Sequence, residues 1–240
     1  MMKLEYLEQN TERIRGEIRA AEEAAGREPG SVMLLAAVKY AQTQEIGYLH
    51  RELGIRDMGE NRVQQLLEHY EALEERNEIN WHFIGTLQTN KVKYIIDKVC
   101  MIHSLDSLKL AAEIDKQARK HGLVMDVLVE INSGEEINKS GLLPGEVEEF
   151  CLALGQYPGI RLRGFMTMAP KCDKKEDYLK YFQQTYAQVL DIWTKKLHNI
   201  GRPLISMGMS ESFVQAIACG SDIVRIGRSL FARETAVGQT

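Results

Sequence analysis

Eight short apolar runs alternate with amphipathic segments along this chain of 240 residues. Such runs have the length of strands, and most are too continuously apolar for a sheet with one wet face, so the pattern predicts parallel strands that are buried on both sides. Eight strand and helix units in a chain of this length predict a single closed (β/α)8 TIM barrel. The predicted strands lie at about 32–38, 57–60, 81–84, 99–105, 124–131, 160–168, 204–207 and 222–226.

A further amphipathic segment, at about 4–25, precedes the first strand and predicts an extra N-terminal helix. The longest helix is predicted over 178–197, and its aromatic stripe at helical spacing is assigned to the core. No Pro/Gly/Ser-rich linker divides the chain, so we expect one domain over 1–240. An open doubly wound sheet would alternate in the same way. That fold carries a glycine-rich dinucleotide fingerprint after its first strand, and the absence of one here favours the barrel.

The composition is that of an ordinary globular protein, with 44% hydrophobic residues and a net charge of -4. This balance gives no electrostatic case for nucleic acid, and no apolar stretch has the length of a membrane span. The charged N-terminal segment contains no apolar core of a signal peptide, so we expect a cytoplasmic protein. The four cysteines are widely spaced, with no CxxC pair, which predicts reduced thiols and neither a disulfide framework nor a metal site.

Ligand-facing residues of a TIM barrel lie at the carboxyl ends of its strands. The first apolar run, Val32 to Val38, ends abruptly in Lys39. A lysine at the point where a core opens can be partly desolvated, which favours the neutral, nucleophilic amine and makes Lys39 a candidate Schiff-base lysine. The alternative is a lysine that marks the end of the strand and points into water.

The loops after the seventh and eighth strands are the usual phosphate site of such barrels. Gly208 permits a close backbone approach, and Ser210 is predicted to cap the next helix, with its N–H groups facing an anion. Gly227 and Arg228 are predicted to open a second helix beside it. These residues are either a phosphate site or two ordinary capped helix starts.

A phosphate site opposite a strand-end lysine describes a pyridoxal phosphate site. Arg225, at the end of the eighth strand, is a candidate partner for the pyridine nitrogen. An arginine there stays charged and leaves the ring nitrogen unprotonated, which makes the ring a weak electron sink. The alternative for Arg225 is a salt bridge under the mouth of the barrel.

At these positions the chain resembles the pyridoxal phosphate homeostasis proteins, which are single-domain relatives of the N-terminal barrel of alanine racemase. The resemblance covers nearly the whole chain. It is carried by Ala37-Val38-Lys39, Gly59-Glu60-Asn61-Arg62-Val63-Gln64, the segment from Trp81 to Lys91, Asn132 with Glu136, Lys139 and Gly141, Ser206-Met207-Gly208-Met209-Ser210, and Val224-Arg225-Ile226-Gly227.

The resemblance implies a carrier or regulator of pyridoxal 5'-phosphate, with no established turnover and a part in vitamin B6, amino-acid and keto-acid balance. It implies that Lys39 forms the imine and that Arg225 meets the ring nitrogen. The other implied cofactor-binding residues are Asn61 near the ring, and Met209, Ser210, Gly227 and Arg228 at the phosphate. One departure is Gln65, which stands where an acidic residue is usual.

Two enzymatic alternatives remain. The first is an amino-acid racemase or lyase that uses the same cofactor. Racemases of this type take a second base from a C-terminal β domain, for which we expect no room here. The second is a cofactor-free aldolase that uses Lys39 with Glu60, His82 or Asp106 as general acid. We expect no catalytic residues, a monomer, and PLP-dependent apo-enzymes as partners.

Overall fold

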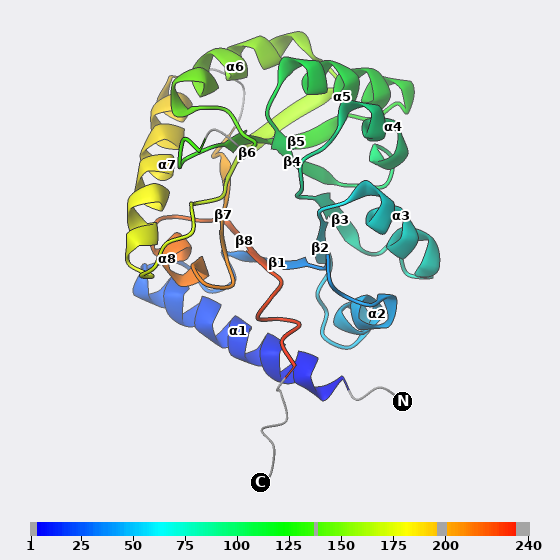
Figure 1. Ribbon diagram of the computed structural model, residues 1–240, viewed down its shortest axis with the longest axis vertical. Coiled ribbons are helices and arrows are strands. Elements are labelled where there is room, and N and C mark those ends of the chain that lie inside the picture. The colour runs from blue at the N-terminus through cyan, green and yellow to red at the C-terminus, as the bar shows by residue number, and fades with distance from the viewer. Residues whose placement is uncertain (1–3, 137–138, 196–200, 234–240) are drawn as a thin grey trace.

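Eight parallel strands close into a barrel in the order of the sequence, from β1 round to β8 and back to β1 (Figure 1). This computed structural model describes residues 4–136, 139–195 and 201–233. The predicted TIM barrel is confirmed. The strands are β1 (Met33–Ala37), β2 (Asp57–Glu60), β3 (Asn80–Phe83), β4 (Met101–Leu105), β5 (Met125–Ile131), β6 (Ile160–Thr167), β7 (Leu204–Met209) and β8 (Ile223–Ile226).

The strand bounds agree with the predicted runs within two residues at each end. The two-residue extension of β7 has a physical cause in its pairing with β8. The register of this pair shifts between Ser206 and Met209, so the strand continues through a bulge that contains Gly208. Gly208 has a φ of 93° there, a conformation that side chains with a Cβ rarely adopt.

Helices surround the barrel and connect consecutive strands (Figure 1). The longest of the connecting helices agrees with the prediction at its start, while Leu197 at its predicted end lies outside the described residues. The helices are α1 (Glu5–Ala24), α2 (Thr43–Arg51), α3 (Val63–Ala72), α4 (Val92–Ile95), α5 (Leu108–Lys120), α6 (Val147–Ala153), α7 (Asp177–Thr194) and α8 (Phe213–Ala218), with short 3-10 turns at Thr89–Lys91, Pro144–Glu146 and Leu154–Gln156.

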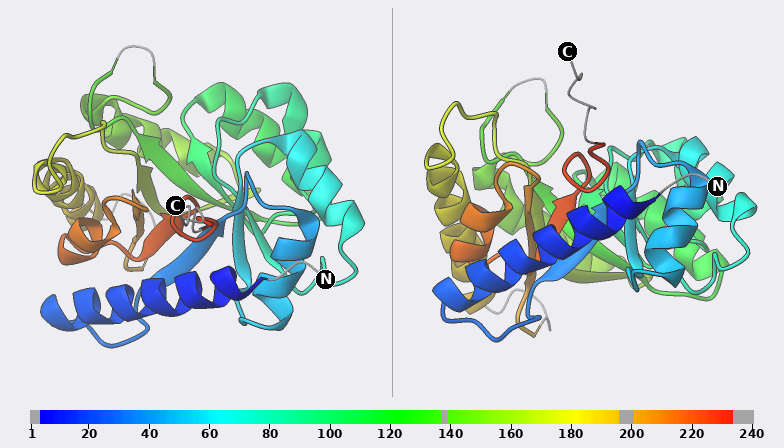
Figure 2. Two further views of the ribbon diagram at one scale, coloured as in Figure 1. Left: turned by 60° about the horizontal axis from the view of Figure 1, so that its bottom comes forward. Right: turned by 90° about the horizontal axis from the view of Figure 1, so that it is seen from below.

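The N-terminal helix α1 fills a position in the ring that a helix after β8 would otherwise occupy. Between residues 227 and 233 the chain forms a single turn, in which Leu230 N and Phe231 N each donate to Gly227 O at 3.0 Å. The helix predicted to open at Gly227 is therefore absent from the described residues. Figure 2 shows α1 crossing beside β8 and β1, and its buried Leu7 and Ile14 supply the apolar cover that this side of the barrel needs.

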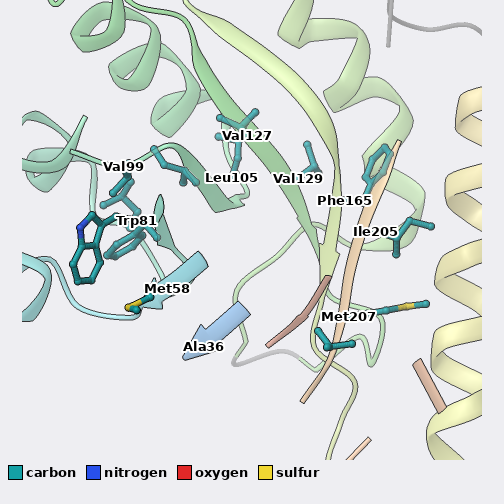
Figure 3. Close-up of a cluster of buried hydrophobic side chains, with 14 of the residues drawn as sticks. Ala36, Met58, Trp81, Val99, Leu105, Val127, Val129, Phe165, Ile205 and Met207 are labelled. Carbon is teal, nitrogen blue, oxygen red and sulfur yellow. The ribbon is translucent and has the colours of Figure 1, made fainter. Parts of the chain in front are cut away.

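Most of the apolar core lies between the outer face of the barrel and the helices. Figure 3 shows labelled side chains of this layer, which come from strands around the barrel and include Met58 and Trp81 on adjacent strands. A smaller cluster fills the barrel interior and consists of Leu35, Ile84, Met101, Leu128, Met166 and Ile223. Across the described ranges, no helix combines the length and apolarity that crossing a membrane requires.

Candidate functional site

A cavity of about 260 Å³ opens at the carboxyl ends of the strands. Residues from β1, β8 and the loops after β1, β2 and β7 line it, so segments far apart in sequence meet at one end of the barrel. All seven predicted cofactor-binding residues are among the lining residues, namely Lys39, Asn61, Met209, Ser210, Arg225, Gly227 and Arg228. The barrel closure brings the predicted site together.

Lys39 lies two residues beyond the end of β1. Its side chain is exposed, and its Nζ atom lies 4.7 Å from the centroid of the Tyr40 ring. The expectation of a partly desolvated amine is therefore wrong, because the chain leaves the barrel before it reaches Lys39. A hydrogen bond from Gln65 Nε2 to Lys39 O, at 2.6 Å, fixes the backbone of this loop to α3. A glutamate at position 65 could not donate that bond.

Asn61 is held at the cavity by a close approach between the ends of β2 and β3. A Cβ atom on Gly85 would lie 2.2 Å from Asn61 O, so only glycine permits this packing. Next to it, the buried carboxylate of Glu60 contacts Asn61 N at 3.2 Å and His69 Nδ1 at 2.7 Å. This buried pair fixes α3 against β2 and thereby places Asn61.

The end of β7 carries Met209 to the cavity, and the loop after it carries Ser210. The prediction that Ser210 caps the following helix is wrong, because α8 begins at Phe213 and Ser212 occupies the position before it. The Ser210 hydroxyl instead accepts a hydrogen bond from Ser229 N at 3.2 Å, which links this loop to the turn after β8. The Ser212 hydroxyl accepts from Met209 N at 3.3 Å.

The turn after β8 places Gly227 and Arg228 in the cavity wall, with Gly227 packed against the end of β1. The Arg228 guanidinium is exposed and forms an ion pair with Glu211, so it closes the rim between two loops. The Ser229 hydroxyl oxygen is buried without a hydrogen-bond partner among the described residues. A buried hydroxyl that the protein leaves unpaired is a feature expected beside a polar ligand.

Arg225 is the one cation at the site that is fully enclosed, with 4% of its surface exposed. Its Nη1 donates to Ser206 O at 2.8 Å and to Ser206 Oγ at 2.7 Å, and its Nη2 donates to Thr167 O at 2.9 Å. Burial lowers the pKa of Arg225 to about 10, against the opposing charge of Glu130. The guanidinium is therefore charged at neutral pH. The salt-bridge alternative is wrong within the described residues, because these three acceptors are neutral oxygens.

Two carboxyl groups lie at the same end of the barrel, and burial raises the pKa of both. For Glu130 the charge of Asp106 adds to that effect, while a hydrogen bond from Ser140 Oγ, at 2.9 Å, opposes it. For Asp106, hydrogen bonds from Gly141 N and from Ser107 oppose the effect of burial on the pKa. Neither residue lines the cavity that contains Lys39.

The three general acids suggested for a cofactor-free aldolase are all placed away from Lys39. Glu60 is paired with His69, Asp106 lies near Gly141, and His82 points into the barrel interior. None of these three residues lines the cavity that contains Lys39.

The residues present fit pyridoxal 5'-phosphate. They supply a primary amine on Lys39, an enclosed guanidinium on Arg225 and, at the loops after β7 and β8, hydroxyl and backbone N–H groups suited to an anion. Glycine at position 227 lets the turn after β8 pack closely against the end of β1, since a Cβ there would lie 2.9 Å from Ala37 O. The donor set matches a ligand with a carbonyl group, a ring nitrogen and a phosphate.

Sequence reasoning missed several residues of the site. Tyr178 of α7 lines the cavity, although its place in an aromatic stripe had assigned it to the core. Ala37, Tyr40, Ile84 and Met168 also line it. Ala37, Tyr40 and Ile84 lie in or beside segments that carry the family resemblance, and Met168 ends a predicted strand. Ser206 also lies in such a segment, but no sequence signal indicated that it and His103 would be buried behind Arg225, because their burial depends on the barrel interior.

The comparisons with known proteins agree with this geometry. The family model of the alanine racemase N-terminal domain matches residues 9–234. A curated relative, the pyridoxal phosphate homeostasis protein of Aquifex aeolicus, is 42% identical over 219 residues, which cover 91% of this chain and 94% of the relative. The crystal structure of an unknown protein from Bifidobacterium adolescentis has a TM-score of 0.85 at 33% identity, and the match covers 95% of each chain. The structure of PipY from Synechococcus elongatus with PLP bound has a TM-score of 0.78 at 26% identity and covers 90% of this chain and 100% of that one.

Proposed function

The chain belongs to the alanine racemase N-terminal domain family and, within it, to the pyridoxal phosphate homeostasis proteins, and from this premise we propose that it carries or buffers pyridoxal 5'-phosphate without catalysing a reaction. Pyridoxal 5'-phosphate is its cofactor, in agreement with the names of its relatives and with the PLP bound to PipY. The protein takes part in intracellular vitamin B6 homeostasis.

One observation carries this proposal. A single cavity brings the amine of Lys39, the enclosed guanidinium of Arg225 and the loops after β7 and β8 to one end of the barrel. Pyridoxal 5'-phosphate supplies, when bound, an aldehyde that condenses reversibly with a primary amine and a conjugated ring that absorbs visible light. Its aldehyde, ring nitrogen and phosphate each have a matching group in the cavity.

We assign a role to each residue on this basis. Lys39 is the reversible covalent anchor, and its exposure suits a carrier that must release its cargo. Arg225 donates to the ring nitrogen, and Asn61 lies beside the ring. Met209 and Ser210 after β7, and Gly227 and Arg228 after β8, hold the phosphate end.

Absorption spectroscopy tests the assignment of Lys39. We expect the purified protein to take up added pyridoxal 5'-phosphate with a visible band, to lose that band on treatment with borohydride, and to gain the mass of the reduced cofactor on Lys39. Lys39→Ala should show no band, while Lys91→Ala, another exposed lysine outside the cavity, serves as control. A colourless protein that takes up no cofactor would overturn the proposal.

A transfer assay separates a carrier from a buffer. The loaded protein is mixed with a PLP-dependent apo-enzyme, and the recovery of that enzyme's activity is compared with recovery in an equal concentration of free cofactor. We expect faster recovery from the loaded protein. We also propose that the protein is a cytoplasmic monomer with a single domain over residues 1–240 and that its partners are PLP-dependent apo-enzymes. Sedimentation tests the monomeric state.

An amino-acid racemase is the second candidate, and one observation favours it. Tyr178 lines the same cavity as Lys39. The amine of Lys39 and the hydroxyl group of Tyr178 can both exchange protons. Racemisation requires such a group on each face of the cofactor. We expect no racemisation of a panel of amino acids above the rate of free cofactor. A rate that exceeds it and falls in Tyr178→Phe would establish the racemase.

A further inference from the structure

A column of polar side chains crosses the interior of the barrel from the cavity to the opposite end. Arg225 Nη1 lies 2.7 Å from Ser206 Oγ, which lies 3.2 Å from His103 Nδ1. His103 Nε2 lies 3.0 Å from His82 Nδ1, and His82 Nε2 lies 3.3 Å from Asp57 Oδ1. The first four residues are buried. Asp57 is partly exposed and lines a second cavity, of about 630 Å³, at the amino ends of the strands.

The charges at its two ends give this column a direction. The guanidinium of Arg225 can only donate, so Ser206 Oγ accepts from it and is free to donate its own hydrogen to His103 Nδ1. His103 then carries its hydrogen on Nε2 and donates to His82 Nδ1. His82 in turn carries its hydrogen on Nε2 and donates to the carboxylate of Asp57. Every group is satisfied with both histidines neutral, and the bonds run one way from cation to carboxylate.

The surroundings of the column favour neutrality at its centre and negative charge at its far end. Burial lowers the pKa of His103 well below its usual value, and the charges of His82 and Arg225 lower it further. Burial is the largest influence on the pKa of Asp57 and raises it, but the hydrogen bonds from His82 and Asn80 and the charges of His82 and Arg56 together outweigh burial, so the net direction is downward.

The other charged groups near the column either form ion pairs with residues outside it or interact with the residue at one of its ends. Glu130 on β5 opposes the charge of Arg225. Asp126, also on β5, is paired with Arg161 and with Arg163, the latter at 3.0 Å. Asp57 is therefore the acidic group at the end of the column, where it contacts His82.

We propose that His103 and His82 are positioning residues that hold Arg225 toward the cofactor through Ser206 and make the direction of the Ser206 hydroxyl hydrogen, beside Arg225, depend on protonation at the Asp57 end. This inference rests on the proposed function. When the column takes up one proton from solvent, the charge resides on His82 beside the carboxylate. His82 then donates through Nδ1, and His103 must accept on Nε2 and donate from Nδ1 to Ser206. The hydrogen that was on His103 Nε2 is then on His82 Nδ1, and the added proton is on His103 Nδ1. The Ser206 hydroxyl keeps its hydrogen but turns it away from His103, its oxygen accepts from both His103 Nδ1 and Arg225 Nη1, and no bond between heavy atoms changes.

Nuclear magnetic resonance of the histidine ring nitrogens tests the hydrogen bonding without any cofactor. In the 15N-labelled protein above neutral pH, we expect both His82 and His103 to be neutral and to carry their hydrogen on Nε2. A neutral His103 with its hydrogen on Nδ1 would overturn the proposal. This arm uses the unmodified chain, so it does not depend on whether a variant folds.

The visible spectrum of the protein loaded with pyridoxal 5'-phosphate tests the coupling to the cofactor site. We expect one reversible spectral step with pH in the unmodified protein. Asp57→Asn should move its midpoint down, because the column then ends on a neutral amide. His103→Asn keeps an acceptor near Ser206 but cuts the link to His82, and it should abolish the step while the visible band remains.

Controls separate this inference from the proposed function. His50→Gln, on α2 and outside the barrel interior, should leave the midpoint unchanged. A band with no pH step in the unmodified protein, or a step whose midpoint is unchanged in either Asp57→Asn or His103→Asn, overturns the coupling and leaves the cofactor assignment standing. A protein that takes up no pyridoxal 5'-phosphate overturns the proposed function, and the ring-nitrogen measurement then decides whether the column exists.

Discussion

The two ends of the barrel hold similar charged residues in opposite ways. At the amino ends of the strands, the buried carboxylate of Asp222 accepts from Arg202 at 2.7 Å, from Arg27 at 3.2 Å and from Ile205 N at 3.0 Å. At the carboxyl ends, neither Lys39 nor Arg225 has an ion pair within the described residues. Cations that the protein leaves without a carboxylate partner are available to an anionic ligand, whereas charges that are paired internally stabilise the fold.

The largest expected effect comes from breaking the paired end. Asp222→Ala should lower the free energy of unfolding by about 2–4 kcal/mol, because it leaves Ile205 N and two arginines without their acceptor. Urea denaturation measures this change. Lys39→Ala is the matched variant at the other end and should change stability by less than about 0.5 kcal/mol, since its side chain is exposed. Equal losses in both variants would contradict the division between the two ends.

A backbone change at the ligand end should affect stability and binding together. In Gly208→Ala, the new Cβ would lie 2.6 Å from Ala216 Cβ in a backbone with a φ of 93°. We expect a loss of about 1–3 kcal/mol and weaker uptake of pyridoxal 5'-phosphate, because Met209 and Ser210 must shift. Thermal melting and a titration monitored by absorbance measure the two effects. Gly145→Ala meets no atom within 4 Å and should change neither.

Buried carboxyl groups at the ligand end should give stability a specific pH dependence. Burial raises the pKa of Asp106 above its ordinary 3.8, so the folded state binds this proton more tightly than the unfolded state does. The stability that this difference adds to the folded state is fully present below pH 3.8, the ordinary pKa of the group. It is lost as the pH rises through the raised pKa of Asp106 in the folded state. Asp106→Asn should therefore show a smaller fall of unfolding free energy with pH just above 3.8. Parallel curves for the two proteins in urea titrations would refute this.

The smallest expected effect concerns the loop that carries Lys39. Gln65→Glu removes the donor to Lys39 O and should change stability by no more than about 0.5–1 kcal/mol, with a modest change in cofactor affinity. Gln64→Glu adds the same charge on α3 without contacting that carbonyl, so it serves as control. An equal change of affinity in both variants would assign the effect to charge rather than to the hydrogen bond.

The sequence was sufficient to find seven of the residues that line the cavity. The apolar run before Lys39 marked a strand end, and glycine, serine and arginine after the last two strands predicted a phosphate site, because TIM barrels present their ligands from those ends. The same reasoning was wrong about the desolvation of Lys39 and about Ser210 as a helix cap. Both errors concern positions one or two residues beyond an element, where loop conformation depends on packing that no local pattern encodes.

The amino-acid sequence by itself determined the barrel, because eight apolar runs with intervening helices have few ways to bury both faces of a parallel sheet. Only the tertiary structure decided what fills its interior. Asp57, His82 and His103 lie on three strands, and they meet Ser206 and Arg225 because barrel closure joins β8 to β1 and strand register sets the height of each side chain. Inward and outward positions alternate along a strand, so a shift of one residue in register would separate the column entirely. Contacts of that kind follow from geometry across the whole sheet, which no single stretch of sequence contains.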